Sequence, residues 1–199
     1  MSIKRLGFIR HPLSLILVYL VVAVIALNAL VANFTTAMPG TLTIQPSDQI
    51  QPSEFDIFYW DLWWVRHAVF DLHVSPLYTN FIAYPFTSPL AGHTLALLWG
   101  LVSAPFQVAL GLIPAFNGII IFSFVTAAVL TYLFARRHVK HHSVALLAGL
   151  IFAFTPAMIR RASIGHLDKI SIFWLPLALL LWDKVAESRR WMWAVALGL

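Results

Sequence analysis

The feature that most constrains the fold is a series of long apolar runs separated by short charged segments. The first run, from Leu13 to Val31, has 19 residues and no charge, and Lys4, Arg5 and Arg10 precede it. A signal peptide has a shorter apolar core of about 7–15 residues, whereas about 20 apolar residues cross a bilayer as a helix. We therefore expect a retained membrane helix whose N-terminal end faces the cytoplasm.

Composition supports a membrane protein throughout the chain. Only 11% of the 199 residues are charged and the mean hydropathy is +0.83, whereas about a quarter of the residues in an ordinary soluble domain are charged. The fold class predicted is all-α, a polytopic transmembrane helix bundle. The final apolar run is still in progress at residue 199, so we expect the chain to be the N-terminal part of a longer protein. The absence of cysteine excludes disulfides and thiolate chemistry.

The basic residues predict which runs cross the membrane. If the run 94–113 stays on the outer side, nine of the 13 basic residues are cytoplasmic and four are outside; if it crosses, the numbers become six and seven. Only the first arrangement obeys the positive-inside rule. The predicted protein is therefore a multi-pass protein of the cell membrane with a cytoplasmic N-terminus. The expected spans are 13–33, 117–135, 144–158, 170–183 and 191–199, and the expected outer loop is 34–116, in which 94–113 is re-entrant or peripheral.

In this topology the acidic residues gather on one side of the membrane. The chain has eight acids, and six of them fall on the outer side: Asp48, Glu54, Asp56, Asp61, Asp71 and Asp168. The first five lie in the first outer loop and Asp168 lies in the second. Because these two loops carry most of the acidic residues of the chain, we expect a functional site to lie in them. The net charge of +5 is attributed to the cytoplasmic loops and not to nucleic-acid binding.

Residues 54–72 are predicted to form an amphipathic helix on the bilayer surface. Apolar residues recur there at steps of three and four: Phe55, Phe58, Leu62, Val65 and Val69. The neighbouring aromatic residues suit the membrane–water interface; they are Tyr59, Trp60, Trp63 and Trp64. Asp61 is expected to be a solvated residue of this helix. Asp71 and His73, near its far end, are expected to lack a functional role.

Two interpretations of Glu54 and Asp56 stay open. On an extended backbone, side chains two residues apart point the same way, so both carboxylates could hold one Mg²⁺ or Mn²⁺ ion, or one of them could act as a general base. Alternatively, the acids cap the helix that follows and interact favourably with its dipole.

The segment 160–169, RRASIGHLDK, also has two interpretations. Arg160 and Arg161 can bind phosphate through the planar fork of the guanidinium, and Gly165 permits an unusual backbone. His166 and Asp168 can face a substrate or a metal. A membrane-interface loop whose basic residues reach lipid phosphates explains the arginines, but it leaves His166 and Asp168 unexplained.

Other polar features point away from chemistry. The basic segment 136–142, RRHVKHH, is interpreted as a cytoplasmic loop that sets topology, and Asn28 and Asn117 as polar groups in helix packing. The chain has no nucleotide-binding or hydrolase motif. No charge lies in the middle of an apolar run, which argues against an ion pump or a proton relay.

The order of these motifs resembles the N-terminal half of the C-type glycosyltransferases, the multi-span superfamily that uses polyprenyl-phosphate-linked sugars. The likeness covers nearly the whole chain and rests on SEFDIFYWDLWWVRHAVFD, YPFTSPLAGH, ARRHVKHHS and ALLAGLIFAFTPAMIRRASIGHLDKISIFWLPLALLL. The superfamily includes oligosaccharyltransferase catalytic subunits and protein mannosyltransferases. The chain looks most similar to bacterial relatives with WNLWW and GHL patterns, which read WDLWW at 60–64 and GHL at 165–167 here.

The resemblance implies a membrane glycosyltransferase of the hexosyltransferase type that acts on the extracytoplasmic side. Glu54 or Asp56 would be the catalytic acid of the first outer loop, and Asp168 would match a metal ligand of the second. Arg160 and Arg161 would hold the donor phosphate, beside His166. Because His166 stands where a paired-acid motif has its first acid, the chain departs from that motif. Several members of the superfamily work without a metal, with one carboxylate as base.

The partners implied are a polyprenyl-phosphate-linked sugar, the lipid bilayer and an acceptor, and the possible cofactor is Mg²⁺ or Mn²⁺. The alternative function is a non-catalytic membrane protein that binds polyprenyl lipid or scaffolds an envelope-assembly complex. That protein would need the arginines and the amphipathic helix but not the carboxylates.

Overall fold

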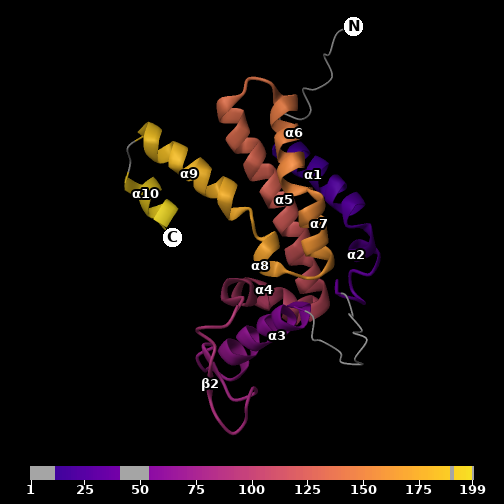
Figure 1. Cartoon of the computed structure of the whole chain (residues 1–199), viewed down its shortest axis with the longest axis vertical. Coiled ribbons are helices and arrows are strands. Elements are labelled where there is room, and N and C mark those ends of the chain that lie inside the picture. The colour runs from indigo at the N-terminus through magenta and orange to yellow at the C-terminus, as the bar shows by residue number, and fades with distance from the viewer. Residues whose placement is uncertain (1–11, 41–53, 189–190, 199) are drawn as a thin grey trace. The chain divides into compact units, whose positions relative to one another are not determined.

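The computed structural model describes residues 12–40, 54–188 and 191–198, and it is mainly helical (Figure 1). The N-terminal part forms α1 (Pro12–Ala26), α2 (Asn28–Ala32), α3 (Glu54–Arg66) and a π-helical turn, η2 (His67–Asp71). Two short antiparallel strands follow, β1 (Tyr78–Thr79) and β2 (Ser88–Pro89). The remaining helices are α4 (Leu97–Leu110), α5 (Leu112–His138), α6 (His142–Ala153), α7 (Pro156–Ser163), α8 (Leu167–Ile170), α9 (Trp174–Ser188) and α10 (Trp191–Gly198). The predicted all-α class is confirmed.

One described helix, α5, is long and apolar enough by itself to cross a membrane. The pair α6 and α7 also passes this test, but the two helices are bent by 43° at the break between them. The break precedes Pro156, the first residue of α7, where the missing N–H costs no helical hydrogen bond. Helices α1 and α4 are apolar but shorter. The five spans predicted from the sequence are therefore a proposal, treated below.

The described residues fall into two compact units. The first contains residues 12–28, 121–159, 170–188 and 191–198, and the second contains residues 29–40, 54–120 and 160–169. The second unit thus brings together the two segments that the charge distribution assigns to the outer side of the membrane. Residues 160–169 join it although they are distant in sequence from the rest of the unit.

The first unit is held by close packing around Tyr19 of α1. The Tyr19 side chain is fully buried, and its hydroxyl donates a hydrogen bond of 3.1 Å to the carbonyl of Leu146 in α6. Gly149, one turn further along α6, leaves room for the phenol ring, because a Cβ there would lie within 3.0 Å of both Tyr19 and the carbonyl oxygen of Ala128. Asn28 does not pack against another helix as predicted; it is exposed and donates to the carbonyl of Ile25 in its own chain segment.

Helix α3 is the central element of the second unit and packs along α4 (Figure 1). The predicted apolar stripe is its buried face, since Phe58, Leu62 and Val65 are at most 3% exposed. Gly100 of α4 allows this close approach, because a Cβ there would overlap with the Val65 side chain. Gln107 of α4 adds a hydrogen bond of 3.1 Å to the carbonyl of Leu62.

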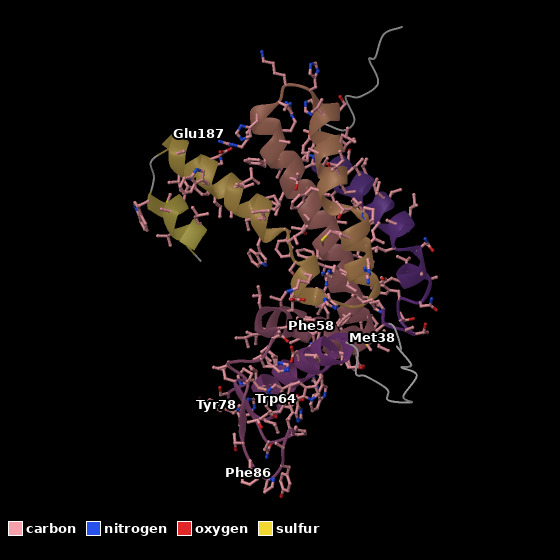
Figure 2. All side chains as sticks on the ribbon, in the orientation of Figure 1. Met38, Phe58, Trp64, Tyr78, Phe86 and Glu187 are labelled. Atoms are coloured by element: carbon pink, nitrogen blue, oxygen red, sulfur yellow. The ribbon has the colours of Figure 1, made fainter. Side chains whose placement is uncertain are left out.

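Two predictions for α3 are wrong. Trp64 does not lie at an interface: it is 1% exposed, packs with Ala68 and Leu90, and donates its indole N–H to the carbonyl of Pro76 at 3.0 Å. Asp61 is not solvated but fully buried. Figure 2 shows Phe58 and Trp64 on α3, and Tyr78 and Phe86 on the segment that follows it.

Asn117 anchors the chain after α2. Its side chain is fully buried in the N-terminal part of α5, and its amide donates to the carbonyls of Phe34 and Ala37 at 2.8 and 2.9 Å. These contacts give hydrogen-bond partners to two backbone oxygens of a segment with no regular structure. The partner of Asn117 is thus a loop, and not another helix as predicted.

Candidate functional site

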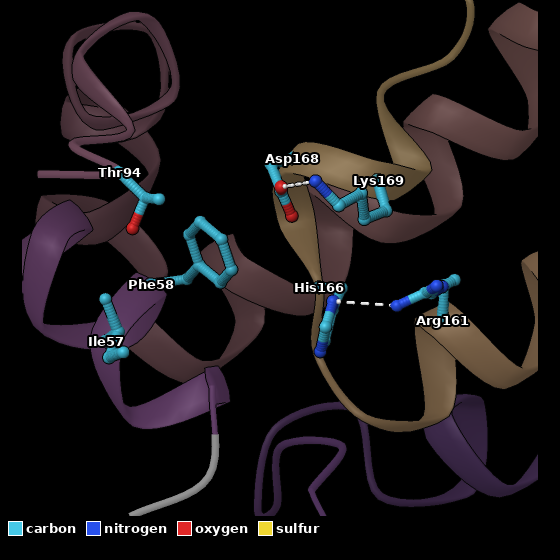
Figure 3. A pocket seen from close by; sticks show the side chains of 7 residues that line it. All are labelled: Ile57, Phe58, Thr94, Arg161, His166, Asp168 and Lys169. Atoms are coloured by element: carbon cyan, nitrogen blue, oxygen red, sulfur yellow. Dashed lines mark hydrogen bonds and ion pairs between the residues drawn. The ribbon is translucent and has the colours of Figure 1, made fainter.

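The candidate site is a pocket of ≈ 390 Å³ within the second unit (Figure 3). Its lining residues come from three parts of the chain: Ile57 and Phe58 of α3, Thr94 of the segment before α4, and Arg161, His166, Asp168 and Lys169 around α7 and α8. Small-molecule pockets in proteins have volumes of about 300–1,000 Å³. The pocket combines an apolar wall with a charged wall, which suits an amphiphilic ligand.

Gly165 shapes the charged wall. It has a φ of 71°, a left-handed conformation that glycine adopts without steric cost. The N–H of Gly165 donates to the carbonyl of Ala162, and the N–H of His166 donates to the carbonyl of Arg161, both at 3.1 Å. These two bonds form a Schellman motif at the C-terminal end of α7. The turn therefore brings His166 back beside Arg161 and starts α8 with Leu167.

The side chains of Arg161 and His166 are also in contact. The guanidinium Nη1 lies 3.4 Å from His166 Nδ1 (Figure 3). His166 is only 6% exposed, and its neighbours Leu167 and Ile170 are buried as well. The burial of α8 thus fixes the imidazole, while Arg161 is exposed on the pocket side.

Asp168 is the acid that lines the pocket, and Lys169 is its partner. The Lys169 ammonium lies 2.6 Å from the Asp168 carboxylate, and the two side chains are 57% and 34% exposed. Solvent screens such an exposed pair, so either group can exchange its partner at little cost. With Arg161, the described pocket carries two permanent cations and one carboxylate.

The other predicted site residues lie outside this lining. Arg160 is exposed on α7 and does not line the pocket. Glu54 and Asp56 lie in the first turn of α3, the turn that also supplies Ile57 and Phe58. Asp56 is exposed, and the side chain of Glu54 lies outside the described residues.

The extended backbone that would let Glu54 and Asp56 converge is not present. On a helix, positions two residues apart are separated by about 200° around the axis, so the two carboxylates do not point the same way. That these acids cap the helix stays a prediction. The catalytic role of either acid stays a prediction.

The described residues do not fit a metal site. Among residues 12–40, 54–188 and 191–198, no group of three His, Asp or Glu side chains is close enough to hold a metal ion. The pocket offers one carboxylate beside two cations, whereas Mg²⁺ and Mn²⁺ prefer several oxygen ligands. No step below therefore uses a metal.

Asp61 is the residue near the site that sequence reasoning missed. Its Oδ2 accepts a hydrogen bond of 3.2 Å from the backbone N–H of Ala96, and its Oδ1 lies 3.6 Å from Nδ1 of His93. Burial raises the pKa of Asp61 to about 6, although the Ala96 N–H and His93 act in the opposite direction. The sequence did contain a signal, since Asp61 is three residues after Phe58 and four before Val65, on the apolar stripe itself.

Asp71 shows how different an exposed acid of the same unit is. It lies 2.7 Å from Nδ1 of His67 and 3.1 Å from the guanidinium of Arg66. The hydrogen bond from His67 lowers the pKa of Asp71. The opposite directions reflect burial at Asp61, and mainly the hydrogen bond from His67 at Asp71.

No protein-family model, curated protein or solved structure matches this chain. The resemblance to the C-type glycosyltransferases therefore rests on the sequence motifs, and the function that it implies is a proposal.

Proposed function

We propose that this chain belongs to a membrane glycosyltransferase that transfers a sugar from a polyprenyl-phosphate donor to an acceptor on the extracytoplasmic side. The observation that carries the proposal is the pocket itself. Residues 161–169 meet the first turn of α3 and Thr94 in one unit, and these are the segments in which the resemblance puts donor binding and catalysis.

The pocket suits a lipid phosphate. The guanidinium of Arg161 can give paired hydrogen bonds to a phosphate, and Lys169 adds a second positive charge. Ile57 and Phe58 provide an apolar surface on the opposite side of the pocket (Figure 3). A phosphate that carries an isoprenoid chain needs both kinds of surface.

The reaction is a displacement at the anomeric carbon. The acceptor oxygen or nitrogen forms a bond to that carbon, and the bond from the carbon to the phosphate oxygen breaks. Polyprenyl phosphate leaves with the electron pair, and an enzyme carboxylate accepts the proton of the acceptor. Arg161 and Lys169 would stabilise the charge that develops on the leaving phosphate.

Three acids are candidates for the proton acceptor. Asp168 lines the pocket, and Glu54 and Asp56 belong to the helical turn that forms its apolar wall. For Asp168 to accept a proton, Lys169 must move from the carboxylate to the donor phosphate. This exchange links donor binding to release of the base.

The membrane setting of the proposal is a multi-pass protein with a cytoplasmic N-terminus. Helix α5 and the bent pair α6–α7 are long and apolar enough to span. Apolar side chains on α1 are exposed, among them Leu13 at 69% and Ile25 at 66%, as expected for a helix in contact with lipid. The charge distribution supplies the orientation.

The test is sugar transfer from polyprenyl-phosphate hexoses in membranes that contain the full-length protein. We expect activity in the wild type and its loss in Asp168→Asn or in the Glu54→Ala, Asp56→Ala double variant, at equal protein levels. Asp71→Asn is the matched control, because Asp71 is exposed and its described partners, Arg66 and His67, lie about one turn before it in the same helical segment. Full activity in all acid variants would refute the catalytic role of these carboxylates.

A second candidate function is a non-catalytic protein that binds polyprenyl phosphate. It is favoured by one observation, the pairing of Asp168 with Lys169, which leaves Arg161 as the main phosphate ligand and no unpaired base among the described lining residues. This protein would bind polyprenyl phosphate in an Arg161-dependent manner, and the acid variants would not weaken binding.

A further inference from the structure

The pocket wall that carries Thr94 is an irregular segment, and its position needs an explanation. Residues 93–96 are the last part of the connection from β2 to α4, and they form no helix or strand. Ala96 is the N-cap residue of α4 and supplies no side-chain cap. The unpaired N–H groups at a helix start need an acceptor from elsewhere.

Asp61 of α3 supplies that acceptor. Its Oδ2 accepts from the N–H of Ala96 at 3.2 Å, and its Oδ1 faces His93 Nδ1 at 3.6 Å. One carboxylate therefore reaches both ends of the segment 93–96. The dipole of α4 favours a negative charge at this end, but this offsets only part of the cost of burying the carboxylate.

The carboxylate lies on the helix face that forms the pocket. Asp61 follows Ile57 by four residues and Phe58 by three, so it is about one helical turn beyond the two apolar lining residues. Figure 3 shows Phe58 and Thr94 on one side of the pocket, and Asp168 and His166 on the other.

We propose that Asp61 is a positioning residue, which clamps the segment 93–96 onto α3 and so places Thr94 in the pocket wall opposite Asp168. As a statement about catalysis, this inference rests on the function proposed above. The clamp itself concerns only the fold of the second unit and can be tested without substrate.

The clamp has a pH dependence whose sign follows from burial. The pKa of Asp61 is about 6 when the carboxylate is buried, compared with about 4 for an exposed aspartate. The described titratable side chain that faces it is His93. Because the pKa of Asp61 is higher in the clamped state than in the open state, the clamped state is fully stabilised below about pH 4. It loses this stabilisation as the pH rises through 6.

Hydrogen–deuterium exchange of the full-length protein in detergent tests the clamp. We expect the equilibrium constant for opening of residues 93–97, obtained from exchange rates corrected for intrinsic exchange, to increase between pH 4 and pH 8. The increase should be at most about 100-fold, because a shift of two pKa units sets that limit. Asp61→Asn is an isostere of the protonated acid and should keep the segment closed at every pH. Asp71→Asn, the matched control, should retain the wild-type dependence.

A second variant keeps the test informative if Asp61→Asn folds poorly. His93→Gln removes the group whose charge lowers the pKa of Asp61, so the midpoint of the pH dependence should move upward. The inference is overturned if Asp61→Asn shows the same pH dependence as the wild type, or if the midpoint is unaffected in His93→Gln.

Transfer assays on the full-length protein separate the clamp from the chemistry. We expect kcat of the wild type to depend on pH near pH 6 and kcat of Asp61→Asn to lack this dependence. The KM for a polyprenyl-phosphate hexose should be the same in the two proteins. Altered exchange with an identical kcat profile would overturn the positioning role. A wild type that transfers no sugar but shows the Asp61-dependent exchange would refute the proposed function and leave the clamp supported.

Discussion

The two units of the chain bury different kinds of side chain. Among the described residues, the buried polar side chains of the first unit are Ser14 and Ser123, whereas those of the second are Asp61, Thr79, Ser103, Gln107, Asn117 and His166. Helices satisfy their own backbone groups, so a helix in lipid needs few polar partners. The irregular segments of the second unit need them, which is why the unit with the pocket is also the unit with the buried polar groups.

Charge is distributed differently as well. In the first unit, the described ion pairs lie between the C-terminal end of α5 and α9, where Arg137 contacts Asp183 and Glu187, and His138 contacts Asp183. In the second unit, Arg161, Asp168 and Lys169 line a pocket. Charge therefore links the ends of α5 and α9 in the first unit, whereas in the second unit it links Asp71 to Arg66 and His67 and also lines the pocket.

The largest expected effect is at Arg161, with its neighbour Arg160 as the matched control. Arg161→Ala should lower kcat/KM for sugar transfer by about 100-fold or more, the usual loss when one donor to a developing negative charge is removed. Arg160→Ala should leave kcat/KM near the wild-type value, because Arg160 does not line the pocket. Equal decreases of kcat/KM in the two variants would contradict the assignment of Arg161, and not Arg160, to the pocket.

The next effect is on the packing of the first unit. Gly149→Ala should destabilise the protein by about 1–3 kcal/mol, as overpacking of a close helix contact does, measured by thermal unfolding in detergent. Tyr19→Phe should not fully restore stability, since the Ala128 carbonyl also lies too close to the added Cβ. Gly118→Ala is the control, because nothing lies within 4 Å of the Cβ added there.

In the second unit, a second substitution should relieve the clash that a Cβ at position 100 makes with Val65. Gly100→Ala should cost about 1–3 kcal/mol of stability, because the added Cβ meets only the Val65 side chain among its nearest atoms. Combining it with Val65→Gly moves the small residue from α4 to α3 and should recover part of the loss. A double variant less stable than both single variants would contradict this packing.

The smallest effect is expected at the ion pairs of the first unit. Glu187 is 66% exposed where it contacts Arg137, so Glu187→Gln should change the free energy of unfolding by no more than about 0.5 kcal/mol. Asp183→Asn should have a larger effect, since the Asp183 carboxylate contacts both Arg137 and His138. Urea or thermal unfolding at low and high salt would measure both.

Local sequence was sufficient to predict the helices and one turn. The spacing from Phe58 to Val65 predicted α3 and its buried face, and the apolar run 117–135 lies within α5. Gly165 predicted an unusual backbone, which the Schellman turn after α7 contains. These features depend on contacts between residues near one another in the chain.

The errors came from residues whose environment is made by distant segments. Asp61 was expected to be in water because carboxylates usually are, but α4 and its preceding segment cover it. Trp64 was expected at an interface, but the chain around Pro76 returns to accept its N–H. Sequence alone could not distinguish Arg160 from Arg161 either.

By itself, the sequence determined that this protein is helical, that its acids cluster in two segments and that glycine turns the chain before His166. Only the tertiary structure decided which of those polar residues share a pocket. The physical reason is that helix periodicity fixes which residues lie on one face, whereas the element that covers that face is chosen by packing between parts of the chain that are far apart. Arg161, Thr94 and Phe58 became neighbours by that packing.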